Sequence, residues 1–130
     1  PGENGFTPLQ PMSLAQLRSL ASHPLVTIGA HSHGHELLDQ IPLDSAVRSV
    51  KRSKELLEKW SEAPVPHFAY PNGNYSAEIM AEVASLGFAS ATILGGRQSK
   101  VDVDLFALPR ISVGRYDSRD RFRVRLMGIG

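Results

Sequence analysis

Three of the five histidines in this chain lie within five consecutive residues, from His31 to His35. The neutral imidazole ring is the commonest metal ligand in proteins at physiological pH. His31 and His35 are four residues apart, so on a helical turn both rings would project from one face. They could then bind one Zn²⁺ at Zn–N distances of about 2.0–2.1 Å, with His33 pointing elsewhere. The spacing predicts a metal site at His31 and His35, and the alternative is a solvated histidine-rich loop.

The residues before the histidines form an apolar stretch over 25–30. A nearly continuous apolar run of this length predicts a strand that is covered on both faces, as in a parallel sheet. The histidines would then follow the carboxyl end of that strand, which is where open α/β sheets and barrels place their sites. This placement favours a metal site over a solvated loop.

Helical spacing of apolar residues predicts two helices in the first half of the chain. The first spans about 13–22, where Ser13 and Gln16 match the capping-box pattern. The second spans about 44–60, with Asp44 as its N-cap. The inner stripe of this second helix contains Ala46, Val50, Leu57 and Trp60. The charged residues of the second helix are expected to form a solvated outer face.

A third helix is predicted where Asn74 or Ser76 can serve as N-cap and Gly87 as C-cap. Its buried stripe contains Ile79, Val83 and Leu86. Further strands are predicted over 67–70, 90–94 and 107–113. Pro109, near the start of the last of these strands, suits an edge or entry position because proline lacks a backbone N–H.

Strands that alternate with helices of about ten or more residues imply parallel strands joined by right-handed crossovers. The expected fold class is therefore α/β, with parallel strands that form either half of a barrel or a small open sheet. The whole chain, residues 1–130, is expected to be a single domain.

The C-terminal segment is rich in arginine over 121–126, where the alternation of residues also suits a strand. The apolar residues at helical spacing are Phe122, Leu126 and Ile129. A helix with Asp117 or Ser118 as its N-cap is the favoured interpretation. Because Asp117 and Asp120 alternate with the arginines, a solvated face is favoured over an anion-binding or nucleic-acid-binding face.

The composition excludes several classes of function. The formal net charge is +1, which gives no electrostatic argument for a nucleic-acid partner. The absence of cysteine excludes a disulfide scaffold, a thiolate zinc site and a cysteine nucleophile. No apolar stretch approaches the roughly 18–20 residues that a membrane span needs, so none is expected.

Four motifs resemble those of the polysaccharide deacetylases, a family that removes N- or O-acetyl groups from chitin, peptidoglycan and exopolysaccharides. The histidine stretch is similar to the H-[ST]-x-x-H metal motif of that family. Phe68-Ala69-Tyr70-Pro71-Asn72-Gly73 resembles the substrate-groove motif that follows it. Leu86-Gly87-Phe88 and Leu108-Pro109-Arg110-Ile111 also match positions of the family. The resemblance implies part of an irregular (β/α) barrel of seven strands.

The resemblance also implies roles for individual residues. His31 and His35 would hold a divalent metal, zinc in most members, and Ser32 would support the turn that carries them. The residues that would bind the substrate are Tyr70, Pro71, Asn72 and Arg110. Tyr70 would lie near the developing oxyanion. In the family an aspartate acts as general base and a late histidine protonates the leaving amine.

The chain departs from the family pattern at the catalytic positions. The T-F-D-D motif that supplies the third metal ligand and the base is absent, and no aspartate precedes His31. The last histidine is His67, so the late acid is also absent. The arginine and tyrosine of the usual R-x-P-Y groove motif correspond to Ala69 and Asn72. The chain therefore resembles the C-terminal two-thirds of a deacetylase domain without the Asp-Asp segment, and its catalytic residues stay unknown.

These observations predict that the parent protein is a metal-dependent deacetylase of an acetylated amino-sugar polymer and that this fragment is inactive by itself. Two alternatives stay open: a non-catalytic metal- or glycan-binding relative, and a half-barrel completed by a partner chain or by self-association. The family resemblance favours the extracellular or periplasmic side of a bacterial envelope. The sequence does not distinguish between sugar polymers, or between N- and O-acetyl substrates.

Overall fold

The computed structural model describes residues 10–95 and 104–127 of the chain. Within these ranges the elements follow in the order α1 (Leu14–Ala21), β1 (Gly29–Ala30), η1 (Leu38–Gln40), α2 (Leu43–Ser61), β2 (His67–Ala69), η2 (Pro71–Gly73), α3 (Ala77–Ser85), β3 (Ser90–Leu94), β4 (Leu108–Arg110) and α4 (Arg119–Leu126), where η denotes a short 3₁₀ helix. Strands and helices alternate along the chain, as the sequence predicted.

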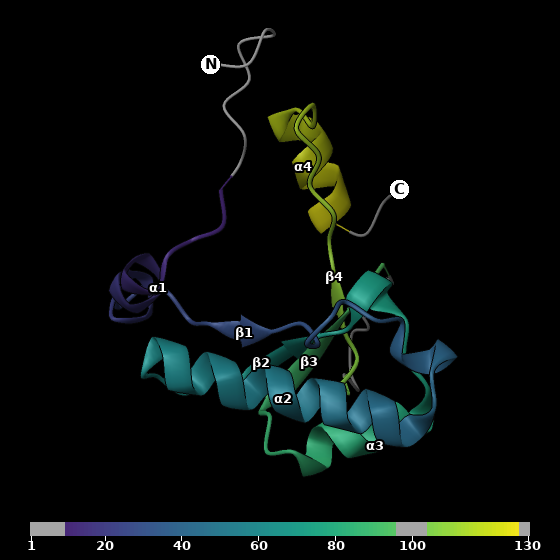
Figure 1. Cartoon of the computed structure of the whole chain (residues 1–130). Helices are drawn as coiled ribbons and strands as arrows, with labels where there is room; N and C mark the ends of the chain where they lie inside the picture. Colours follow the sequence, from purple (N-terminus) through teal and green to yellow (C-terminus); the bar gives the residue numbers. More distant parts are fainter. Residues whose placement is uncertain (1–9, 96–103, 128–130) are drawn as a thin grey trace, which may run out of the picture.

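The four strands form one parallel sheet in the order β1-β2-β3-β4, so neighbours in the sequence are also neighbours in the sheet. Figure 1 shows α2 and α3 packed beside each other against the sheet, while α4 extends away from it beyond β4. All carboxyl ends of the strands therefore lie at one edge of the sheet, which confirms the predicted parallel α/β architecture.

The hydrophobic core lies between the sheet and the two central helices. Ala30, Phe68 and Ala91 stand opposite one another in register on three neighbouring strands, and all three are buried. The buried residues that α2 and α3 add to this core are Ala46, Val50, Ile79 and Val83. Because alternate residues of a strand point to opposite faces, this row defines the covered face.

The strand predicted over 25–30 is much shorter in the structure, because only Gly29 and Ala30 pair with β2. The expectation that it is covered on both faces is wrong, since Leu25 is 88% exposed. A turn uses the backbone groups before the strand: the N–H of Val26 donates to the carbonyl of His23 at 3.0 Å. Within the described residues β1 is an edge strand, with β2 as its one neighbour.

The N-cap of helix α2 lies two residues earlier than predicted, so Asp44 is not the N-cap. Pro42 occupies that position with φ of −54°, and its carbonyl accepts the first helical hydrogen bonds, from the N–H groups of Ser45 and Ala46. Asp44 lies in the first turn instead, where a carboxylate interacts favourably with the helix dipole. Trp60, predicted on the inner stripe, is 38% exposed.

Local signals located the later elements well. Ser76 is the N-cap of α3, where its hydroxyl accepts from the N–H of Ile79 at 3.3 Å. Gly87 follows α3 with φ of 75°, and β3 has the predicted bounds. The strand predicted over 107–113 is shorter, but its proline does lie on an edge strand of the described sheet.

The C-terminal segment is helical, as favoured, with Ser118 rather than Asp117 as the N-cap of α4. The hydroxyl of Ser118 accepts from the N–H of Arg121 at 3.2 Å. The predicted apolar stripe is not buried, because α4 has no buried residue. Ile129, the last member of that stripe, lies outside the described residues.

Candidate metal centre

Three of the elements that carry predicted site residues end at the same edge of the sheet. His31 directly follows β1, Tyr70 directly follows β2, and Arg110 is the last residue of β4. In a parallel sheet these carboxyl ends share one edge, which is the usual place for a ligand site in α/β folds. The fold therefore brings the predicted metal and substrate residues to one side of the molecule.

The histidine loop, residues 31–36, is not the helical turn that the spacing suggested. Ser32 and His35 adopt left-handed backbone conformations, with φ of 60° and 59°. This loop nevertheless brings the rings of His31 and His35 together, with their centroids 4.8 Å apart and their planes at 76°. The pairing of the two imidazoles was predicted, but a different backbone path produces it.

A backbone carbonyl of the neighbouring strand orients His31. Its Nδ1 lies 2.6 Å from the carbonyl oxygen of Ala69, the last residue of β2. Because a carbonyl can only accept, Nδ1 must carry the proton, and the lone pair of Nε2 is left available. Histidines that bind metals commonly donate their second ring N–H in this way, which fixes the tautomer and the ring orientation.

The two rings fit two positions of a zinc site. Tetrahedral coordination at about 2.1 Å places the centroids of two imidazoles about 5 Å apart, which agrees with the observed 4.8 Å. Both side chains are exposed and therefore accessible to a metal ion. Within residues 10–95 and 104–127, however, no group of three His, Cys, Asp or Glu side chains could hold a metal. The described residues thus offer two candidate ligands, fewer than the three that a catalytic zinc site generally uses.

The carboxylate of Glu36 accepts hydrogen bonds that hold the histidine loop in place. It accepts from the hydroxyl of Ser49 at 2.8 Å and from the N–H of Gly34 at 3.1 Å. Burial alone would raise the pKa of Glu36, but hydrogen bonding from its own backbone N–H, from the hydroxyls of Ser49 and Ser32 and from the N–H of Gly34 outweighs burial and lowers the pKa to about 2. Glu36 is therefore ionised, and neutral hydrogen-bond donors of the protein stabilise its negative charge.

Ser49 is a residue that the sequence interpretation missed. It lies on the buried face of α2, and its hydroxyl also accepts from the N–H of His33 at 3.0 Å. Ser32, which the resemblance assigned as the support of the loop, has a buried hydroxyl that makes no hydrogen bond of regular geometry in the described residues, although it lies close enough to the Glu36 carboxylate to lower the pKa of that group. The signal for Ser49 was available, because it is a polar residue on the helical stripe of Ala46 and Val50.

The predicted substrate residues after β2 divide between the core and the surface. The ring of Tyr70 is fully buried and packs edge-on against Phe68 at 5.3 Å. Burial, followed by the nearby Asp104 and Tyr75, raises the pKa of Tyr70, and its hydroxyl has no hydrogen-bond partner in the described residues. The backbone N–H of Tyr70 donates to the carbonyl of Thr92 in β3 at 3.1 Å, so this N–H is used in pairing with the neighbouring strand.

The next residues turn the chain towards the surface. Pro71 is buried, whereas Asn72 is exposed and has a left-handed backbone with φ of 54°. The amide of Asn72 donates to Asn74 at 3.0 Å, and Asn74 donates to Asp39 of η1 at 3.2 Å. Of the predicted substrate residues in this turn, Asn72 is the one whose side chain is accessible.

Arg110 is half-buried at the end of β4, where its Nε donates to the carbonyl of Ile93 at 3.1 Å. Because β3 and β4 are adjacent, this bond joins the two strands at the same sheet edge as the histidines. The role of Arg110 in substrate binding stays a prediction.

The family model for polysaccharide deacetylases matches residues 10–91, which include the histidine loop and the turn after β2. The chain belongs to the polysaccharide deacetylase family. No curated protein matches it significantly.

Solved deacetylase structures share the fold of this family member. A deacetylase of Streptococcus pyogenes in complex with acetate has 21% identity and a TM-score of 0.78, and the match covers 86% of this chain and 49% of that one. A polysaccharide deacetylase of Bacillus cereus has 22% identity and a TM-score of 0.75, with 86% and 35% covered. A de-N-acetylase of Aggregatibacter actinomycetemcomitans has 13% identity and a TM-score of 0.69, with 86% and 52% covered. The chain spans about half the length of these structures or less.

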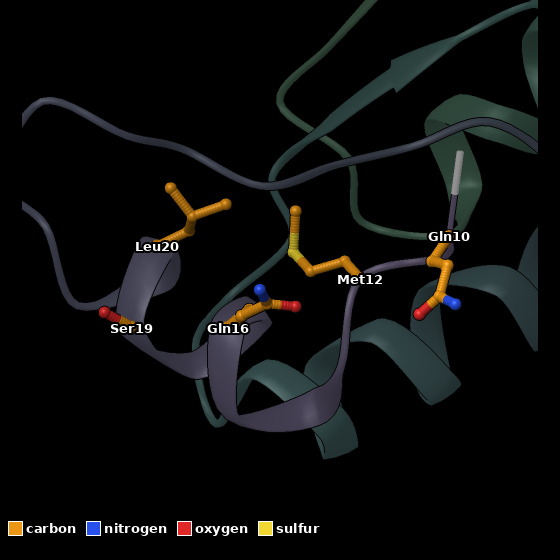
Figure 2. Close-up of a pocket in the computed structure, with 5 residues that line it drawn as sticks. All are labelled: Gln10, Met12, Gln16, Ser19 and Leu20. Carbon is orange, nitrogen blue, oxygen red and sulfur yellow. The ribbon is translucent and has the colours of Figure 1, made fainter. Parts of the chain in front are cut away.

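A separate open cavity of about 560 Å³ lies beside α1 and does not include the histidine loop. It is lined by Gln10, Met12, Gln16, Ser19 and Leu20. Figure 2 shows the side chains of Met12 and Leu20 rising from the segment before α1 and from its last turn. Among the helices of the described ranges, none has both the length and the hydrophobicity to cross a lipid bilayer.

Proposed function

We propose that the chain is the histidine-bearing part of a metal-dependent deacetylase that hydrolyses acetyl groups on an amino-sugar polymer. The observation that carries this proposal is the pair of imidazoles, 4.8 Å apart, in which the carbonyl of Ala69 leaves Nε2 of His31 free. Family membership supports the class of reaction. The Streptococcus pyogenes neighbour was solved with acetate, which is the acid that such a hydrolysis releases.

The residues of the chain have separable tasks in this proposal. His31 and His35 hold the divalent metal, for which zinc is the best candidate. When bound, such a metal polarises the acetyl carbonyl and activates a water molecule. The polymer approaches the carboxyl edge of the sheet, where the exposed side chain of Asn72 and the half-buried Arg110 are available to bind sugar hydroxyls.

The 130-residue chain by itself is expected to bind a divalent metal weakly and to lack deacetylase activity. Catalytic zinc sites generally use three protein ligands and a water, and the described residues provide two. The sequence also lacks the adjacent aspartates and the late histidine that act as base and acid in the family. The loss of each such group lowers the rate by about 10²–10⁴-fold.

Isothermal titration with Zn²⁺ tests the metal site. Wild type should bind about one Zn²⁺ per chain, and His31→Ala and His35→Ala should each abolish binding because a single imidazole holds zinc poorly. His67→Ala is the matched control, since His67 is an exposed histidine at the start of β2 that contacts Ser90 instead. Equal losses in all three variants, or no binding by wild type, would contradict the proposal. Zinc-dependent hydrolysis of an acetylated chitooligosaccharide would contradict the inactivity of the fragment.

A non-catalytic metal- or glycan-binding relative is a second candidate. It is favoured by the missing third ligand within residues 10–95 and 104–127. The coding sequence immediately upstream of Pro1 separates the two candidates. A T-F-D-D-like segment there supports the enzyme, because it would supply the third ligand and the base, whereas a different upstream sequence supports the binding module.

A half-barrel that pairs with a partner chain or with itself is the third candidate. Within the described sheet β1 and β4 each have one neighbour, and unpaired strand edges favour further pairing. Met12 and Leu14, on the α1 side, are 53% and 50% exposed. Light scattering tests self-association: a dimer that buries more than about 1,000 Å² would support it, and a monomer would count against it.

A further inference from the structure

The histidine loop has a backbone that must be held in place by its surroundings. Ser32 and His35 are both in the left-handed region, which residues with a side chain rarely adopt. Non-glycine residues persist in such conformations where neighbouring structure imposes them. Because His35 is one of these two residues, the contacts that impose its backbone also decide where its ring lies.

Two side chains outside the ligand pair supply these contacts. Ser49 of α2 is buried, and its hydroxyl uses both of its hydrogen-bonding functions on the loop. It accepts from the N–H of His33 at 3.0 Å and donates to the carboxylate of Glu36 at 2.8 Å. The same carboxylate accepts from the N–H of Gly34 at 3.1 Å. The serine and the glutamate thus connect the middle and the end of the loop to α2.

The fit around the carboxylate of Glu36 is close. A methyl group added at Gly34 would lie 2.8 Å from Oε1 of Glu36, which is shorter than such contacts normally are. A side chain at position 34 would therefore make the Glu36 carboxylate shift from its present place beside the N–H of that residue. The opposite end of the loop is held separately, by the bond between His31 and the carbonyl of Ala69.

We propose that Ser49 and Glu36 are positioning residues for the histidine pair, and that they set its affinity for a divalent metal by holding the loop in its ligand-binding shape. Neither residue is a ligand in this inference. It rests on the proposed metal function, and it adds that the affinity depends on a buried serine of α2. Partners of metal ligands typically change metal affinity by about 10–100-fold when they are replaced.

Ser49→Ala is the main variant, and Ser53→Ala is its matched control. Ser53 is a buried serine one turn further along the same face of α2, and it has no side-chain hydrogen bond to the histidine loop. Titration with Zn²⁺ alone should show affinity weakened about 10-fold or more in Ser49→Ala and unchanged in Ser53→Ala. Ser49→Thr keeps a hydroxyl and should restore most of the affinity. Equal losses in the two alanine variants, or wild-type affinity in Ser49→Ala, would overturn the proposal.

Two measurements on the metal-free chain separate this proposal from the metal function itself. Amide exchange at His33 should accelerate in Ser49→Ala, because its N–H loses its acceptor, and the nuclear Overhauser contact between the rings of His31 and His35 should weaken. Both signals should persist in Ser53→Ala. If wild type binds no Zn²⁺, the proposed metal function fails. The two signals then decide by themselves whether Ser49 positions the histidine loop, and unchanged signals in Ser49→Ala would overturn that role.

Discussion

The unit formed by β2, α3 and β3 and the edge formed by β1 and the histidine loop are held by different forces. In the central unit, Phe68 and Ala91 face each other in register and are completely or almost completely buried. At the edge, His31 and His35 are exposed, and hydrogen bonds from the loop to the carbonyl of Ala69 and to the hydroxyl of Ser49 fix its shape. Burial stabilises the first region, whereas directed polar contacts determine the shape of the second. The site is therefore sensitive to single hydrogen bonds in a way that the core is not.

The largest expected effect is the truncation of the central aromatic residue. Phe68 is 1% exposed and packs against Tyr70 and Phe88, with centroid distances of 5.3 and 5.4 Å. Phe68→Ala should lower the free energy of unfolding by about 3–5 kcal/mol, measured by urea denaturation. Phe122→Ala, at a 38% exposed position of α4, is the control and should cost less than about 1 kcal/mol. Similar losses for the two would remove the distinction between a buried centre and an open periphery.

The next effect tests the turn that follows β2 in the central unit, at Gly73. Its φ is 75°, and an added Cβ would lie 2.5 Å from the backbone nitrogen of Leu94. Gly73→Ala should therefore destabilise the chain by about 2–4 kcal/mol, from the left-handed backbone and from the clash together. Gly95→Ala separates the two causes, because Gly95 has φ of 70° but nothing within 4 Å of its added Cβ. Its expected cost is about 1–2 kcal/mol, and equal costs would show that the contact with Leu94 is not tight.

A smaller effect of opposite sign is expected at Tyr70. Its hydroxyl is buried without a hydrogen-bond partner in the described residues, so it loses its hydration on folding without compensation. Tyr70→Phe should leave the free energy of unfolding unchanged or raise it by about 1 kcal/mol, in thermal or urea denaturation. Tyr75→Phe, at a 39% exposed ring, is the control and should be neutral. A loss of more than about 1 kcal/mol in Tyr70→Phe would show that the hydroxyl has a partner in the folded chain.

The smallest effect is expected at the third histidine of the loop. The loop contact of His33 in the structure is its backbone N–H, which donates to Ser49, and its side chain is exposed. His33→Ala keeps that N–H, so its Zn²⁺ affinity should stay within about twofold of wild type, well inside the effect expected of a ligand. Isothermal titration checks this, with His35→Ala as the contrasting variant. A loss as large as that of His35→Ala would make His33 a third ligand.

The central unit could be predicted well from the sequence because its signals are local. Ser76 and Gly87 lie next to the ends of α3, and the bounds of β3 follow from the apolar run between Gly87 and the polar loop. The beginning of α2 was placed two residues late because Asp44 is a good N-cap by type. In the structure the carbonyl of Pro42, two residues before Asp44, accepts the first backbone hydrogen bonds of that helix.

The histidine site could be predicted in its residues but not in its geometry. The spacing of His31 and His35 suggested a helical turn, whereas the left-handed backbone of the loop depends on partners far along the chain. Ser49 lies 16 residues after His33, and Ala69 lies 38 residues after His31. A local pattern cannot report contacts of that range. The strand expected over 25–30 is also shorter than predicted. Its first residues do not pair with β2, and the N–H of Val26 forms a turn hydrogen bond to the carbonyl of His23.

The shortness of β1 has a consequence for how the site opens. Only Gly29 and Ala30 pair with β2, so this strand can detach at the cost of few backbone contacts and the burial of Ala30, while the rest of the core between β2, β3 and the helices stays folded. Detachment would separate His31 from the carbonyl of Ala69 and leave its ring free to change tautomer. A metal that binds only the attached form would then draw the population towards it, by the usual linkage between a ligand and the state it prefers. Metal binding and the docking of β1 are, in this sense, one equilibrium.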